Sequence, residues 1–287
     1  MRALVAAFVL AALPFGAHAE WIFDAEPALS YASNLSNAQH TTDAHGDEAL
    51  RLDLSGGQFV ALSGADTLTA TIEFETEQYR RYQPLSHVDA GGAVAYRHKF
   101  GLGYAAPWVS LSASAARQFY RDSIRDGDRI QLQISGGRRI SERLDASAGW
   151  VHDRRDAHGG APEVPGISGQ VFDLNGNSVF VRLGYAACDR LSLSVRVDAR
   201  RGDIESTAEP GYAIYSVSSA IAEDPTFGAD AYAYRLRGTT YAGRLGASWA
   251  LGAHSSINLD GNIQRTLAAN SIDYHGNGAT LSYIYRY

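Results

Sequence analysis

The chain has 287 residues, a formal net charge of −6, one cysteine and a mean hydropathy of −0.20. A single cysteine forms no internal disulfide, and the mild acidity argues against a nucleic-acid-binding protein. After residue 19 no apolar run approaches the roughly twenty residues that a membrane-spanning helix needs, which excludes a helical membrane protein. A barrel of spanning strands is not excluded, because half of each such strand is polar.

Residues 1–19 have the order of a cleaved secretory signal. Arg2 supplies a basic start, residues 3–15 form an apolar run, and Ala17-His18-Ala19 is a small-residue cleavage site before Glu20. The apolar run is too short for a spanning helix. We therefore expect a signal peptide over 1–19 and one mature domain over 20–287.

The mature chain is a series of segments of about ten residues in which apolar and polar side chains alternate. In the segment 67–79, Leu68, Ile72 and Phe74 share one parity, whereas Glu73 and Glu75 share the other. A period of two predicts strands rather than helices. We expect twelve strands, at 25–34, 49–62, 67–79, 87–100, 107–120, 128–139, 144–154, 173–187, 191–202, 232–251, 256–265 and 278–287.

The connections between these strands alternate between long and short. The long ones include 35–48, 155–172 and 203–231, and the short ones are 63–66, 101–106, 141–143, 188–190 and 252–255. Outer-membrane barrels have long outer loops and short periplasmic turns, whereas a sandwich has no reason for this alternation. The prediction is an all-β fold, a closed antiparallel transmembrane β-barrel of about 12 strands. The connection 203–231 should lie on the cell surface, folded inward as a lid with a helical turn within 215–222.

Charged residues follow one parity of the predicted strands. Turned toward lipid, each Arg at mid-depth would cost roughly 2–4 kcal/mol, so this parity should face a polar lumen. The small residues Gly91, Ala93 and Ala95 should leave space beside the acidic segment 67–79. In a ring of twelve strands, this acidic segment lies opposite the basic segment 191–202. Asp145, Asp198 and Arg244 share the inward parity. The predicted lumen-lining residues are Arg51, Asp53, Glu73, Glu75, Glu77, Asp89, Arg97, Arg182, Arg196 and Arg200.

Two stretches resemble known families. The final segment "ATLSYIYRY", from Ala279 to Tyr287, resembles the last strand of bacterial outer-membrane β-barrels, which typically ends in an aromatic residue. The resemblance implies recognition by the outer-membrane insertion machinery, and pairing of the last strand with the first. The segment "PALSYASNLSNAQ" is similar to the first barrel strand of surface lipoprotein assembly modifiers, which would imply a role in lipoprotein export.

Two residue groups suggest catalysis. His254, Ser256 and Asn258 resemble the His-x-Ser pair of outer-membrane phospholipase A, but their parity is inward and they lie at a predicted periplasmic turn. Asp273-x-His275, placed in the last outer loop, resembles the Asp-His pair of omptin proteases, with Glu75 and Glu77 as the paired acids. The preferred interpretations are a capped turn and a polar barrel lining, so no catalytic residue is predicted.

Two loop clusters suggest a divalent metal ion. The first contains His40, Asp43, His45 and Asp47, and the second contains His152, Asp153, Asp156 and His158. Neither spacing matches a tight ligand template, and solvated loops are often rich in these residues. We therefore predict no metal and no cofactor.

The sequence favours a narrow outer-membrane channel for small polar or ionic solutes. The alternative is a barrel with a blocked lumen that presents surface loops for adhesion, or that assembles and exports proteins or lipoproteins. A third hypothesis, an outer-membrane hydrolase, depends on the catalytic groups above. The expected partners are outer-membrane lipid and lipopolysaccharide, together with the insertion machinery, and no nucleic acid. Arg51 pairing locally with Glu77 would favour the blocked lumen.

Overall fold

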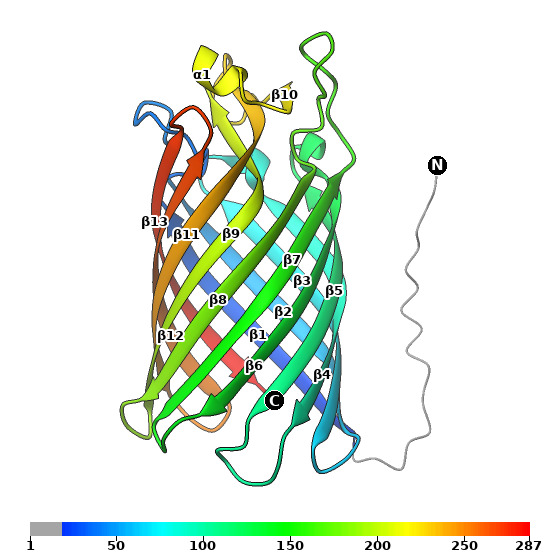
Figure 1. Ribbon diagram of the computed structural model, residues 1–287, viewed down its shortest axis with the longest axis vertical. Helices are drawn as coiled ribbons and strands as arrows, with labels where there is room; N and C mark the ends of the chain where they lie inside the picture. Colours follow the sequence, from blue (N-terminus) through cyan, green and yellow to red (C-terminus); the bar gives the residue numbers. More distant parts are fainter. Residues whose placement is uncertain (1–18) are drawn as a thin grey trace.

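A computed structural model describes residues 19–287, which form a closed antiparallel β-barrel (Figure 1). Twelve strands make the wall, and one short strand, β10, is added at the long-loop end. Among these residues no helix is both long and apolar enough to cross a membrane. The predicted signal peptide, apart from Ala19, lies outside the described residues.

The barrel strands follow one another in chain order around the ring. Two 3-10 turns, η1 (Gln83–Leu85) and η2 (Ser123–Arg125), and one helical turn, α1 (Tyr212–Tyr215), lie in the long loops. The strands are β1 (Ala19–Ala32), β2 (Asp47–Ala61), β3 (Asp66–Tyr79), β4 (His87–Lys99), β5 (Trp108–Tyr120), β6 (Gly127–Arg139), β7 (Leu144–Ala157), β8 (Leu174–Ala186), β9 (Leu191–Ala208), β10 (Ala220–Glu223), β11 (Tyr232–Ala250), β12 (Ser255–Ala268) and β13 (Asp273–Arg286).

The predicted fold class and the twelve predicted wall strands are confirmed, but several of the predicted strand ends are wrong. β1 begins at Ala19 instead of 25, and β9 continues to Ala208 instead of 202. β13 begins at Asp273 instead of 278, so Asp273 and His275 belong to a strand and not to a loop. β10 was missed, and the helical turn lies at α1, mostly before the predicted stretch 215–222. The start of β1 lies at the short-turn end, and the other differences lie at the long-loop end, where contacts between loops extend the strands.

The ring closes between the first and last wall strands. Ala25 pairs with Tyr285 and Leu29 with Leu281. The backbones of Phe23 and Tyr287 exchange hydrogen bonds, at 3.0 Å from the Phe23 amide and 2.8 Å from the Tyr287 amide. The final tyrosine therefore lies in the seam, where closure leaves no free strand edge.

Alternation along the strands gives the wall one apolar and one polar face. Ile72, Leu245 and Ile263 are 62%, 64% and 68% exposed on the outer face, with Tyr283 and Tyr285 near the short-turn end. Tyr234, near the long-loop end of β11, is buried at 2% exposure. The two buried hydrophobic clusters are built from the ends of wall strands and from long loops. The molecule therefore exposes apolar side chains along its length and packs a core at one end only.

Candidate functional site: a charged lumen beneath an outer plug

One half of the inner wall carries a row of carboxylates. Glu26 of β1 lies across from Asp53 of β2, which lies across from Glu75 of β3, which in turn lies across from Asp89 of β4. Side chains directly opposite on one face of a sheet are close neighbours, so like charges in this row repel one another. The sequence pattern singled out three members of this row and did not include Glu26, although Glu26 lies within the strand expected at 25–34.

Local partners neutralise part of this acidic wall. Arg51 pairs with Asp53 at 2.8 Å and with Glu26 at 3.8 Å. The pairing of Arg51 with Glu77 that was considered from the sequence is not formed, since Glu77 accepts a hydrogen bond of 2.9 Å from the Tyr79 hydroxyl. The acidic wall therefore keeps more carboxylates than paired cations.

The other half of the wall carries a row of arginines. Arg182 of β8 lies across from Arg196 of β9, which lies across from Arg244 of β11. Arg196 binds Asp198 through Nε and Nη2, with the shortest distance 2.6 Å. Within residues 19–287, Arg182 and Arg244 make no ion pair. Arg200, predicted to belong to this wall, is bound to Asp153 at 2.8 Å.

The strand order places the two rows on opposite walls. In a ring of twelve strands, β8, β9 and β11 lie across from β2, β3 and β4. Opposed rows of unlike charge produce a field across the space between them, and low-dielectric walls strengthen it. The arrangement therefore has the charge polarity expected from the segments 67–79 and 191–202.

A cavity lies beside part of each wall. A cavity of about 340 Å³ lies beside the acidic wall and is lined by Glu73, Glu75, Asp89, Gly91 and Ala93. A second cavity, of about 430 Å³, includes Arg182 and Asp145. Two of the three small residues expected to leave room beside the acidic wall, Gly91 and Ala93, therefore line a cavity, and Ala95 does not line it. A Cβ atom at Gly91 would collide with the Ala115 carbonyl, so a glycine is required there by the close approach of β4 and β5.

Arg97, another predicted lumen residue, lies toward the short-turn end. Its guanidinium stacks on the Trp108 ring at 4.2 Å from the centroid, and both residues line a cavity of about 570 Å³. The stack holds the cation by its attraction to the ring face. Arg97 therefore lines the interior without belonging to either charged row.

The structure also brings together a cluster that the sequence analysis missed. Glu75 of β3 and His87 and Asp89 of β4 each offer one metal-ligand atom within 4.8 Å of the others. The available signal was the His-x-Asp spacing at the start of β4, which puts both side chains on one face of a strand. Its relation to Glu75 depends on the β3–β4 register, which the spacing does not reveal.

At the long-loop end, the tip of β9 bends across the barrel mouth. The Thr207 amide donates to the Ser36 carbonyl at 2.7 Å, although β11, β12 and β13 separate β9 from the strand that precedes Ser36. Phe227, in the loop after β10, stacks on His45 with ring centroids 5.4 Å apart and contacts Tyr82 at 5.0 Å. We name residues 204–231 and the loop residues packed on them the outer plug.

A buried arginine joins the outer plug to the loop between β5 and β6. Arg125 of η2 is 4% exposed and donates to Glu205 and to Asp224, at 2.6 Å each. Asp224 also accepts a 2.7 Å bond from the Thr207 hydroxyl, and Phe172 stacks beneath the guanidinium at 4.3 Å. Burial acts to lower the pKa of Arg125, but the two carboxylates outweigh it and raise this pKa above its ordinary value. The network holds a charge that would be costly to bury alone.

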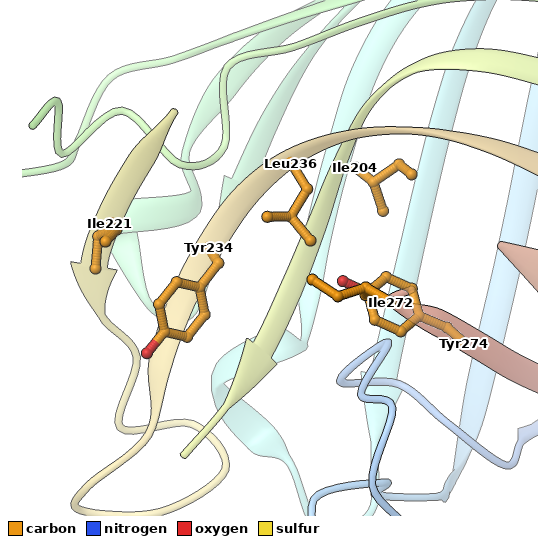
Figure 2. Packing of buried hydrophobic residues seen from close by; sticks show 6 residues of the cluster. All are labelled: Ile204, Ile221, Tyr234, Leu236, Ile272 and Tyr274. Carbon is orange, nitrogen blue, oxygen red and sulfur yellow. The ribbon is translucent and has the colours of Figure 1, made fainter. Parts of the chain in front are cut away.

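Apolar side chains complete the outer plug. Ile204 of β9, Leu236 of β11 and Tyr274 of β13 gather in one cluster with Ile221 of β10 (Figure 2). Leu236 is 1% exposed, and Ile214 of α1 packs against the cluster. The connection predicted as an inward-folded lid is therefore packed onto the ends of strands instead of lying free above them.

The catalytic arrangements suggested by the sequence are not assembled. His254 Nδ1 lies 3.0 Å from the Arg286 carbonyl, whereas the Ser256 hydroxyl lies near Asn258. Asp273 and His275, 3.2 Å apart, share the outward parity of Leu281, so the wall separates them from Glu75 and Glu77.

The two loop clusters do not form metal sites either. Asp47 caps the amides of Arg81 and Tyr82, and His45 is stacked on aromatic rings. Among the described residues, the only group of three ligand atoms in mutual reach is the cluster of Glu75, His87 and Asp89.

Comparison with known proteins supports the fold. No family model matches the chain, and no curated protein matches its sequence. An outer membrane channel from Pseudomonas putida F1 has a similar structure, with a TM-score of 0.61, covering 96% of this chain and 97% of that one at 13% identity. The NanC porin gives a TM-score of 0.48, covering 91% and 98% of the two chains at 9% identity. The chain therefore has the fold of the outer-membrane β-barrels.

Proposed function

We propose that this protein is an outer-membrane channel for small polar or ionic solutes. The observation that carries the proposal is the pair of opposed charged rows on the inner wall, with one cavity beside Glu75 and Asp89 and another beside Arg182. A barrel that served only as a scaffold could fill its interior with apolar side chains, as small barrels do. Charged rows across a polar space instead orient and select solutes by charge. The proposal assigns no catalytic residue.

The outer face supports insertion of the barrel in the outer membrane. Large apolar side chains are exposed on strands all round the ring, which in water would be an unusually large apolar surface. In a bilayer the same side chains face lipid and lipopolysaccharide, and the closed ring satisfies the backbone. In this orientation the short turns face the periplasm and the outer plug faces the exterior.

Conductance across a planar bilayer tests the channel proposal. We expect current from the purified protein, and a shift of ion selectivity toward anions when Glu73, Glu75 and Glu77 are all replaced by Gln. Gln keeps the size of each side chain and removes its charge, so the acidic wall loses its attraction for cations. An unchanged reversal potential across a salt gradient, in a variant that still conducts, would contradict the proposed field.

Tyr287→Asp tests the closure and insertion of the barrel. The backbone of Tyr287 completes the seam with Phe23, and the substitution places a negative charge at that position. We expect much less heat-modifiable, membrane-inserted protein, whereas Tyr287→Phe should insert normally because it keeps the aromatic ring. Normal insertion of Tyr287→Asp would count against a role for the seam residue.

The outer plug favours one alternative, a barrel with a blocked lumen that presents its loops for adhesion or for protein and lipoprotein assembly. Asp224 and Phe172 at its centre are 0% and 1% exposed, so the centre of the outer plug excludes water. If neither the parent nor variants with a loosened outer plug conduct, this alternative replaces the channel. Current that appears only when the outer plug is loosened identifies it as a gate.

A further inference from the structure

The side chains of Glu75, His87 and Asp89 each offer one metal-ligand atom, a carboxylate oxygen or an imidazole nitrogen. One atom from each lies within 4.8 Å of the other two. His87 and Asp89 are each 9% exposed, and Glu75 and Asp89 line the same 340 Å³ cavity. The cluster therefore combines buried ligand atoms with access from the lumen.

The orientation of His87 follows from its hydrogen bond. Its Nδ1 lies 3.0 Å from the carbonyl oxygen of Leu85, which only accepts, so Nδ1 carries the hydrogen. The ring is held in place by stacking on Tyr120, with centroids 4.6 Å apart. In the neutral imidazole, Nε2 then presents a lone pair toward Glu75 Oε1 at 3.6 Å. Two electron-rich atoms facing each other need a cation or a proton between them.

Asp89 provides an independent observation. Its Oδ2 accepts a 2.7 Å bond from Gln118, which fixes the side chain, but its Oδ1 is buried with no hydrogen-bond partner among the described residues. An unpaired buried acceptor costs about 1–3 kcal/mol, and more when it is charged. Arg129 lines the same cavity but donates to Gln131 instead of to Asp89. A bound cation would satisfy Oδ1 and Nε2 together.

We propose that Glu75, His87 and Asp89 form a binding site for a divalent transition-metal ion of the Zn²⁺ type. One imidazole nitrogen with two carboxylates is a donor set that suits zinc and its neighbours, whereas Mg²⁺ and Ca²⁺ prefer oxygen ligands alone. The two carboxylates balance the charge of the ion. Leu85 and Gln118 orient the ligands in the way that outer-shell partners of metal sites do. Three protein ligands leave further positions for water or a solute from the lumen.

Calorimetric titration of the EDTA-treated barrel in detergent with ZnCl₂ tests the site. We expect one ion per chain in the parent, and affinity lowered about tenfold or more in His87→Gln and in Asp89→Asn. Titration with MgCl₂ should give no comparable binding. Equal affinity for Zn²⁺ in the parent and His87→Gln, or no binding by the parent, overturns the proposal.

Matched controls separate the cluster from other histidines and carboxylates. His254→Gln removes an exposed imidazole at a short turn, and Glu73→Gln removes the next inward carboxylate on β3. Both should leave the affinity for Zn²⁺ unchanged. A loss in His254→Gln as large as that in His87→Gln would identify non-specific binding and overturn the site.

A variant that gains an absorption band tests metal ligation even if a variant that removes a ligand fails to fold. Asp89→Cys puts a thiol at the position of the carboxylate whose Oδ1 has no partner, and Co²⁺ bound to a thiolate has a charge-transfer absorption that the parent lacks. We expect this absorption in the heat-modifiable, folded variant. Its absence there overturns ligation by position 89. Because ion binding is measured in detergent, these results do not depend on whether the barrel conducts.

Discussion

The outer plug and the charged lumen both hold arginines paired with carboxylates, yet the surroundings of the pairs differ. Arg125 is 4% exposed and stacks on Phe172. Its partner Asp224 is fully buried and accepts a hydrogen bond from Thr207 at the tip of β9. Arg196 and Asp198 on the inner wall are 33% and 23% exposed, and the Arg196 guanidinium lies over the Phe180 ring. An arginine–aspartate pair therefore stabilises the packing of the outer plug, whereas a second pair of the same type belongs to the more exposed inner wall.

The difference follows from the cost of desolvation. Breaking a buried pair by removing one partner costs about 3–5 kcal/mol, because a charge is left without compensation. Breaking a solvent-exposed pair costs roughly 0–1 kcal/mol. The outer plug is thus expected to respond to single substitutions by opening, whereas the lumen should respond by changing selectivity with the wall intact.

The largest effect is expected from Arg125→Met. Met keeps much of the side-chain volume but leaves the buried Asp224 and the partly buried Glu205 without their cation, so the outer plug should lose about 3–5 kcal/mol of local stability. Amide hydrogen exchange over residues 204–224 should become faster, and conductance should rise. The matched control is Arg117→Met, which removes an exposed pair with Asp128. Unchanged protection in Arg125→Met would break the contrast between the two regions.

A smaller loss is expected from Leu236→Ala. Leu236 is 1% exposed within the cluster of Figure 2, and truncating a buried leucine costs about 2–5 kcal/mol. Leu245 lies on the same strand but is 64% exposed on the outer face, so Leu245→Ala leaves no cavity. Limited proteolysis of the outer loops should distinguish the two variants. Equal cleavage rates would show that the cluster does not hold the outer plug.

The smallest change in stability is expected from Arg196→Gln. The pair with Asp198 is partly exposed, so unfolding by denaturant should shift by less than about 1 kcal/mol. The reversal potential across a salt gradient should nevertheless move toward cation selectivity, because Asp198 loses its partner in the basic row. A large loss of stability with unchanged selectivity would place Arg196 with the outer plug residues instead of the solute-facing ones.

Local patterns in the sequence predict most of the wall. The alternation in 67–79 and 191–202 identifies strands and assigns Glu75 and Arg196 to the inner parity, since a period of two needs no knowledge of neighbours. The alternation of long and short connections predicts the closed ring. A continuous apolar face also predicts the exposed residues on the outside, because lipid-facing and polar positions must alternate along every spanning strand.

The tertiary structure alone decides which inner residues meet. Glu26, Asp53, Glu75 and Asp89 form one row only through the register of three strand pairs, and Glu75 reaches His87 by the same register. The outer plug depends on contacts between segments far apart in the chain, such as Arg125 with Asp224 and Thr207 with Ser36. These contacts extend β9 and bury Tyr234. Periodicity reports the face of a residue, whereas register and loop packing depend on partners that local sequence does not contain.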